Sequence, residues 1–138
     1  MKPRLLDTHL LLWLAVEPER LGEPLQLELL DRQQPFLFSV ASLWEVAIKS
    51  SLGRSSFRVD ARALRRGLLA EGLQELPVGV EHCLAVQHLP WVHRDPFDRL
   101  LVAAAREEGL CLLTADRTLL AYGPEVELVG GGDADSET

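Results

Sequence analysis

The fold is decided by one stretch, residues 96–116, which read PFDRLLVAAAREEGLCLLTAD. Pro96 suits the first position of a helix and Gly109 is a typical helix end, so we predict a helix over Pro96–Glu108. The run Leu110–Thr114 that follows is apolar without alternation. Such a run is typical of a strand that is buried on both faces, as strands of parallel sheets are.

Outward from this stretch, short apolar runs alternate with helical patterns. Further strands are predicted over Arg4–Asp7, Phe36–Val40, Leu73–Val78 and Val126–Val129. Further helices are predicted over His9–Val16, Leu21–Arg32, Ser42–Leu52, Asp60–Glu71, Val80–His88 and Asp116–Tyr122. This alternation predicts an α/β fold, a parallel sheet flanked by helices on both faces. The 138 residues fit a single domain over 1–130, followed by an acidic, glycine-rich tail over 131–138 that we expect to be disordered.

The composition is that of a globular domain, with 47% apolar and 25% charged residues. The longest apolar run, Leu10–Val16, is far shorter than the roughly 20 residues of a membrane span. Asp7 lies where a signal peptide would need its apolar stretch. We therefore expect a cytoplasmic protein with no membrane partner. Cys83 and Cys111 have apolar neighbours in the sequence and are expected to be buried, reduced thiols.

Carboxylates mark the ends of several predicted strands and the starts of the helices after them. Asp7 ends the first strand, Glu45 is expected in the first turn of the helix after Phe36–Val40, and Asp116 follows the Leu110–Thr114 strand. Asp95 and Asp98 open the Pro96–Glu108 helix. Strand carboxyl ends and the following helix starts lie along one edge of a doubly wound sheet, where ligands bind. Asp7, Glu45, Asp98 and Asp116 are therefore predicted to meet in one pocket.

Two interpretations of these acids remain open. Each acid singly is explained by helix capping, and Ser42 and Glu45 have capping-box spacing. As a set, however, four anions at one edge repel each other, and helix dipoles offset only about 0.3–1 kcal/mol for each. A bound hard cation, Mg²⁺ or Mn²⁺, removes this repulsion. The four histidines show no metal-ligand spacing, and His93 is expected in a surface loop.

Four motifs together resemble the PIN-domain ribonucleases, and most of all the VapC-type toxins of prokaryotic toxin–antitoxin pairs. They read LLDTH at 5–9, SVASLWE at 39–45, HRDPFDRLLVAAA at 93–105 and LTAD at 113–116. Their order and spacing agree with the family from Asp7 to about Val129, nearly the whole chain. The third motif is the most specific of the four.

The resemblance implies a parallel five-stranded sheet and a magnesium- or manganese-dependent endoribonuclease. It places the family's acidic quartet on Asp7, Glu45, Asp98 and Asp116, with Asp95 as a secondary acid that caps a helix or binds metal through water. Three hydroxyl residues are auxiliary polar candidates, although backbone hydrogen bonding explains them as well: Thr8, Ser39 and Thr114. The resemblance further implies a homodimer and a VapB- or Phd-like antitoxin that covers apolar surface and blocks the acidic pocket.

The charge of the chain is unevenly placed. Its net charge of -7 argues against a general nucleic-acid binder. Residues 49–66, however, hold six basic residues and one acid, which gives this segment +5 and the rest -12. Arginine suits phosphate because its planar fork donates two parallel hydrogen bonds. The candidate RNA contacts are Lys49, Arg54, Arg58, Arg62, Arg65 and Arg66, and a solvated helix face is nearly as good an explanation.

The main alternative function is a non-catalytic PIN-like module that binds RNA or protein and holds metal weakly. Two other classes with acids at a sheet edge are excluded. A response-regulator receiver needs a lysine at the end of a late strand, whereas the lysines here are Lys2 and Lys49. A haloacid-dehalogenase-type phosphatase needs a second acid two residues after Asp7, where His9 stands.

Overall fold

Five parallel strands form one sheet in the described part of the chain, which confirms the predicted α/β class. The computed structural model describes residues 2–31, 33–53 and 58–129, so the predicted tail lies outside it. The strand order is β3-β2-β1-β4-β5. The strand bounds are β1 Arg4–Leu6, β2 Phe36–Ser39, β3 Gln74–Leu76, β4 Cys111–Thr114 and β5 Val126–Leu128.

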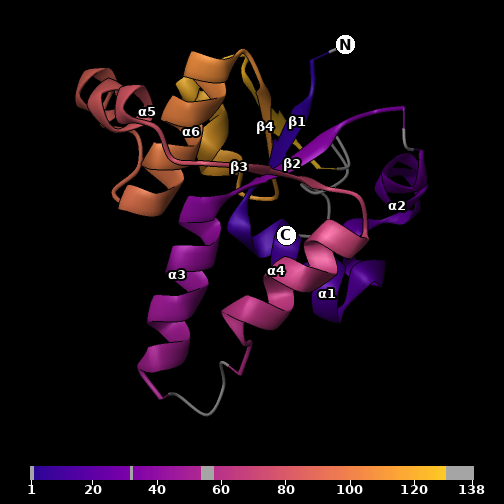
Figure 1. Cartoon of the computed structure of the whole chain (residues 1–138). Coiled ribbons are helices and arrows are strands. Elements are labelled where there is room, and N and C mark those ends of the chain that lie inside the picture. The colour runs from indigo at the N-terminus through magenta and orange to yellow at the C-terminus, as the bar shows by residue number, and fades with distance from the viewer. Residues whose placement is uncertain (1, 32, 54–57, 130–138) are drawn as a thin grey trace.

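Helices cover both faces of this sheet (Figure 1). The α-helices are α1 Thr8–Val16, α2 Glu23–Leu30, α3 Val40–Ser51, α4 Ala61–Ala70, α5 Val80–Ala85 and α6 Pro96–Glu108. The 3-10 helices between them are η1 Pro18–Leu21, η2 Val86–His88 and η3 Arg117–Tyr122. No helix within the described residues is long and apolar enough to cross a membrane.

The core has two halves, one on each face of the sheet. Leu5 and Leu112 point into the half that α6 closes, whereas Leu6 and Leu113 point into the half closed by α1, α3 and α4. These four side chains are at most 2% exposed. Alternate residues of β1 and β4 thus pack into opposite halves, which explains why these strands are apolar without interruption.

The sheet has its topological switch point between β1 and β4. From β1 the chain adds β2 and β3 on one side, then crosses back through α5 and α6 to add β4 and β5 on the other. The crevice above the carboxyl ends of β1 and β4 is where such sheets bind ligands. Asp7 follows β1 and Asp116 follows β4, so the topology brings these two acids to that crevice.

Several predicted helices differ in bounds or type from those observed; Val80–His88, for example, is divided into α5 and η2, and the helix predicted over Asp116–Tyr122 is the 3-10 helix η3. The helix after β2 begins at Val40 rather than Ser42, because the Ser39 hydroxyl caps it by accepting a hydrogen bond from the Ala41 amide at 2.9 Å. The predicted capping box of Ser42 and Glu45 is therefore wrong, and Glu45 lies in the second turn. The predicted helix over Leu21–Arg32 is divided at Gly22, whose φ of +85° ends η1 before α2 begins.

The burial predicted for the two cysteines is wrong. Cys83 is exposed and Cys111 is partly buried, and both are free thiols. On α5 the buried position belongs to His82 instead, because its ring accepts the Gly79 amide at 3.1 Å and lies 2.8 Å from Glu108 of α6. Apolar sequence neighbours indicate burial poorly on a helix, where adjacent residues point in different directions.

Candidate metal centre

Asp7 and Asp116 are joined through the hydroxyl of Thr114 at the end of β4. Thr114 Oγ1 donates a hydrogen bond to Asp7 Oδ2 and accepts one from the Asp116 amide at 3.0 Å. Thr114 is fully buried. Of the three auxiliary hydroxyl residues, Thr114 is the one that contacts two of the predicted acids directly. Ser39 caps α3, and Thr8 Oγ1 donates to Ser42 Oγ at 2.9 Å.

The start of α6 brings Asp95 and Asp98 to the same crevice. Asp95 is the N-cap residue, and its Oδ1 accepts the Phe97 amide at 2.8 Å. Asp98 lies in the first turn, close enough to Asp95, Asp7, Glu45 and Asp116 for their charges to act on it. The helix predicted over Pro96–Glu108 is observed with the same bounds, and this helix start determines where Asp98 points.

Glu45 reaches the cluster from α3. Its side chain is 5% exposed, and its Oε2 lies 2.9 Å from Lys49 Nζ, one turn further along the helix. The other oxygen, Oε1, is buried, and no hydrogen-bond donor among the described residues reaches it. An aromatic contact between Trp44 and Phe97, with ring centroids 5.2 Å apart, holds α3 against the start of α6. This contact keeps Glu45 beside Asp98.

Burial and mutual repulsion shift the ionisation of these acids. Burial, followed by the charges of the four neighbouring acids, raises the pKa of Asp98 to about 7. Burial also raises the pKa of Asp7, although the Thr114 hydroxyl and the Leu10 amide oppose that rise. Asp116 differs: burial acts to raise its pKa, but hydrogen bonds from Thr118 and the nearby His93 hold it below its usual value.

Capping and membership of the cluster are compatible, because a carboxylate has two oxygens. Asp7 Oδ1 caps α1 by accepting the Leu10 amide at 3.0 Å, while Oδ2 accepts from Thr114. Asp116 Oδ1 accepts the Thr118 amide at 2.9 Å and the Thr118 hydroxyl at 2.7 Å, while Oδ2 faces His93. Asp7 and Asp116 therefore each combine a capping oxygen with a second oxygen that faces the cluster.

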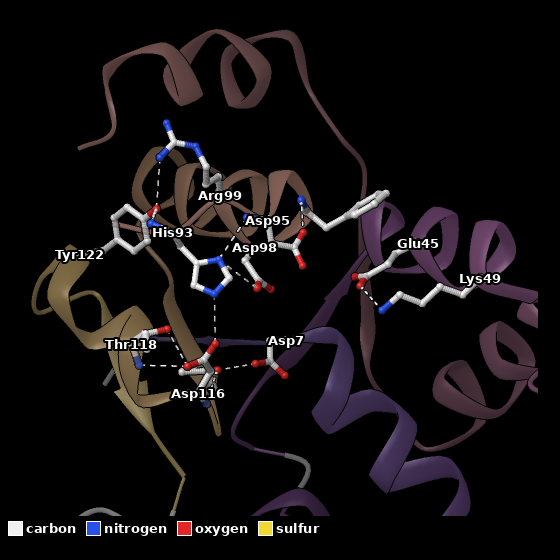
Figure 2. A network of polar contacts seen from close by, with 12 residues as sticks. Asp7, Glu45, Lys49, His93, Asp95, Asp98, Arg99, Asp116, Thr118 and Tyr122 are labelled. Atoms are coloured by element: carbon white, nitrogen blue, oxygen red, sulfur yellow. Dashed lines mark hydrogen bonds and ion pairs between the residues drawn. The ribbon is translucent and has the colours of Figure 1, made fainter. Parts of the chain in front are cut away.

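His93 is the member of the site that the sequence did not predict (Figure 2). Instead of facing solvent from a surface loop, its ring lies between Asp98 and Asp116, with a side chain that is 23% exposed. One ligand atom each from His93, Asp98 and Asp116 lie within 4.8 Å of one another. The available signal was its position two residues before the N-cap Asp95, since the loop that enters α6 leads into the pocket.

The predicted RNA contacts are only partly available. Lys49 pairs with Glu45, and Arg65 Nε lies 2.6 Å from Glu75 Oε2. Arg62 and Arg66 are exposed on α4, and Arg58 is exposed just before it. Arg54 lies outside the described residues. The +5 segment thus keeps Arg62 and Arg66 as exposed cations on one helix.

The donor set fits a hard divalent cation. It consists mainly of carboxylate oxygens, which Mg²⁺ and Mn²⁺ prefer. The buried Oε1 of Glu45 has no donor among the described residues, and a buried anionic oxygen without a partner is costly. The raised pKa of Asp98 indicates a repulsion that a cation would relieve. The arrangement is able to hold such an ion and to present it at the switch-point crevice.

A family model described as PIN domain matches residues 4–123. No curated protein matches the chain by sequence.

Several solved structures are similar to the chain. One is VapBC2 from Rickettsia felis bound to a DNA fragment from their promoter, with 17% identity, a TM-score of 0.67, and coverage of 91% of this chain and 96% of that one. DNA-bound VapBC from Salmonella typhimurium has 18% identity and a TM-score of 0.67, and the match covers 93% of this chain and 98% of that one. A third is VapBC-5 from Mycobacterium tuberculosis, a member of the VapBC family of toxin–antitoxin systems. It has 19% identity and a TM-score of 0.57, and the match covers 94% of this chain and 98% of that one. At these identities the likeness is one of fold.

Proposed function

The chain belongs to the PIN domain family, and from that membership we propose that it is a metal-dependent endoribonuclease, the toxin of a toxin–antitoxin system. The observation that carries this proposal is the position of Asp98 among Asp7, Glu45, Asp95 and Asp116 at the switch-point crevice. Helix capping accounts for one oxygen each of Asp7, Asp95 and Asp116, but it does not relieve the mutual repulsion of the clustered carboxylates, which a bound cation would. RNA in the cytoplasm is the proposed substrate.

Four residues are proposed to hold Mg²⁺ or Mn²⁺: Asp7, Glu45, Asp98 and Asp116. Asp95 is proposed as a secondary acid, because one of its oxygens already caps α6. When bound, the ion supplies an activated water and stabilises the negative charge that develops on the phosphate oxygens. Support comes from the unpartnered Oε1 of Glu45 and from the raised pKa of Asp98.

Other side chains prepare the site for this ion. The Thr114 hydroxyl holds Asp7 and the Asp116 backbone in fixed relation. Lys49 neutralises part of the charge of Glu45 from the outer side of α3. Arg62 and Arg66 on α4 are proposed to contact the phosphates of the RNA strand, since their exposed guanidinium groups suit phosphate geometry.

A VapB-like antitoxin and a second copy of the chain are proposed as protein partners. Exposed apolar side chains follow one another along α3 and its C-cap residue at a spacing of four residues, and Trp44 among them is 60% exposed: Val40, Trp44, Ile48 and Leu52. A continuous exposed apolar face of this kind is typical of protein interfaces. Similarity of fold to VapBC structures supports the antitoxin as one of the two partners.

The test is RNA cleavage by the purified chain. With single-stranded RNA and Mg²⁺ or Mn²⁺, we expect endonucleolytic products that EDTA prevents. Asp7→Asn and Asp98→Asn should each abolish cleavage, because each removes an anionic oxygen from the proposed metal site. Circular dichroism spectra like that of the unmodified chain would show that both variants remain folded.

Asp31→Asn is the matched control, since Asp31 is an exposed acid at the end of α2, and within the described ranges its side chain accepts a hydrogen bond only from the nearby Gln33 amide. This control should cleave like the unmodified chain. Full activity of Asp7→Asn or Asp98→Asn would refute the proposed site. RNA binding without cleavage under all metal conditions would support the non-catalytic binding module instead.

A further inference from the structure

The loop that leads into α6 is held by a buried arginine. Arg99 is 6% exposed, and its guanidinium donates to the Pro90 carbonyl at 2.9 Å and to the Val86 carbonyl at 3.2 Å. It also donates to Tyr122 Oη at 3.2 Å, and Tyr122 Oη accepts the His93 amide at 3.1 Å. Arg99 and Tyr122 therefore fix the backbone of His93 from the core side, as Figure 2 shows.

The hydrogen bonds of the His93 ring determine which nitrogen carries the hydrogen. Nδ1 accepts the backbone amide of Asp95 at 3.2 Å, so Nδ1 must present a lone pair. The hydrogen of the ring then lies on Nε2. Nε2 lies 3.3 Å from Asp116 Oδ2, and through this polar contact His93 lowers the pKa of Asp116. Nδ1 is 3.7 Å from Asp98 Oδ2, beyond hydrogen-bonding distance.

This tautomer decides between two roles for His93. To bind a metal ion through Nδ1, the ring would have to give up the Asp95 N–H that Nδ1 accepts. To bind it through Nε2, that nitrogen would have to lose its hydrogen, and Nδ1 would then carry the hydrogen toward the Asp95 N–H, placing two donors face to face. As a donor, Nε2 instead faces the oxygen of Asp116 that Thr118 leaves free. The geometry favours the donor.

We propose that His93 is a positioning residue, whose Nε2–H fixes the Asp116 carboxylate toward Asp98 without itself binding the metal. The proposal rests on the metal-binding part of the proposed function. Asp116 needs such a donor most, because its side chain is 40% exposed, whereas Asp98 is 19% and Glu45 5% exposed. Thr118 and His93 together hold both of its oxygens in one orientation.

Manganese binding to the purified chain, followed by the loss of the free Mn²⁺ EPR signal, tests the role. Loss of an outer donor to a ligating carboxylate weakens metal binding by about 10–100-fold, so we expect His93→Ala to bind at least about tenfold more weakly. His93→Gln should bind nearly as the unmodified chain does, because its amide N–H replaces Nε2–H. The matched control is His88→Ala, which removes an exposed imidazole from η2 and should change nothing.

Two spectroscopic measurements separate a donor from a ligand. Long-range ¹H–¹⁵N NMR of the metal-free chain should show His93 with hydrogen on Nε2 and none on Nδ1, its peaks being identified by their absence in His93→Gln. Pulsed EPR of the Mn²⁺-loaded chain should show no directly bound nitrogen.

The outcomes distinguish this inference from the proposed function. If the unmodified chain binds no Mn²⁺, the proposed metal site fails and the inference fails with it. If the unmodified chain binds Mn²⁺ and His93→Ala binds it equally well, the inference alone is overturned. It is also overturned by hydrogen on Nδ1, or by nitrogen coupling that disappears in His93→Ala. RNA cleavage remains a separate measurement throughout.

Discussion

Asp98 is the residue at which the requirements of folding and of the proposed metal site conflict most directly. Burial and the charges of Asp95, Asp7, Glu45 and Asp116 raise its pKa to about 7. The folded state therefore binds a proton at Asp98 more tightly than the unfolded chain does. Its contribution to stability is fully present below its ordinary pKa of 3.8 and is lost as the pH rises through about 7.

Asp98→Asn should therefore stabilise the metal-free chain more at about pH 8 than at about pH 5, because it removes the charge that forms in this interval. Thermal unfolding in EDTA measures this difference. Asp60→Asn is the control: Asp60 is the exposed N-cap of α4, and asparagine caps equally well. A gain in melting temperature for Asp98→Asn that is the same at both pH values would contradict the prediction.

The acids that follow strand ends use their two oxygens differently. Asp7 and Asp116 each cap a helix with Oδ1, which any good capping residue would do. Oδ2 of each then faces a buried hydroxyl or an imidazole. Serine or threonine caps as well as aspartate but has no second oxygen. A second contact through Oδ2 explains why aspartate serves at both positions.

At the scale of elements, the start of α6 combines a cap with a charge. Asp95→Ala should cost about 1 kcal/mol of unfolding free energy, because the Phe97 amide loses its acceptor. Asp95→Ser should restore most of that loss, since serine also caps. Asp95→Ser should also lower the pKa of Asp98, on which the charge of Asp95 acts.

Urea unfolding measures the free energies of unfolding of Asp95→Ala and Asp95→Ser. Titration with Mn²⁺ compares the metal affinities of the variants. As a secondary acid, Asp95 should be dispensable for binding, so Asp95→Ser should retain more Mn²⁺ affinity than Asp98→Asn. Equal loss of affinity in the two variants would show that Asp95 binds the ion directly.

The element α3 illustrates how a small error in a helix start changes a side chain's role. The spacing of Ser42 and Glu45 matches a capping box, which predicted a first-turn glutamate bonded to its own helix. Ser39 caps instead, and Glu45 moves to the second turn, where it is buried and points across to α6. Local sequence is compatible with either serine as the cap. In the fold, Trp44 of this helix packs on Phe97 of α6.

At the scale of the whole molecule, the placement of charge matters more than its total. The net charge of -7 includes the acids of the crevice and three acids within 131–138, whereas residues 49–66 carry +5. Within that segment, Lys49 forms an ion pair with Glu45, and Arg65 forms one with Glu75. Arg62 and Arg66 then become the best candidates for contacts with RNA phosphates.

Replacing both Arg62 and Arg66 with alanine should flatten the salt dependence of RNA binding. The log–log slope should fall by about 0.7 for each phosphate that an arginine no longer neutralises. Fluorescence anisotropy in an Asp98→Asn background, at several salt concentrations, measures the slope without cleavage. Arg65→Ala is the matched control from the same helix, because Glu75 already engages its guanidinium, and its slope should change less. An unchanged slope in the double variant would show that this face of α4 is exposed to solvent and does not contact RNA.

Local patterns were enough to predict the α/β class, the order of the strands along the chain and the edge at which the acids gather. Apolar runs and caps are local signals, and parallel strands with crossover helices place their carboxyl ends together. Only the tertiary structure decided that His93 lies between Asp98 and Asp116, that Glu45 keeps an oxygen with no donor among the described residues, and that Arg65 is engaged. These features depend on contacts such as Arg99 with Tyr122, between segments distant in sequence, which no local pattern specifies.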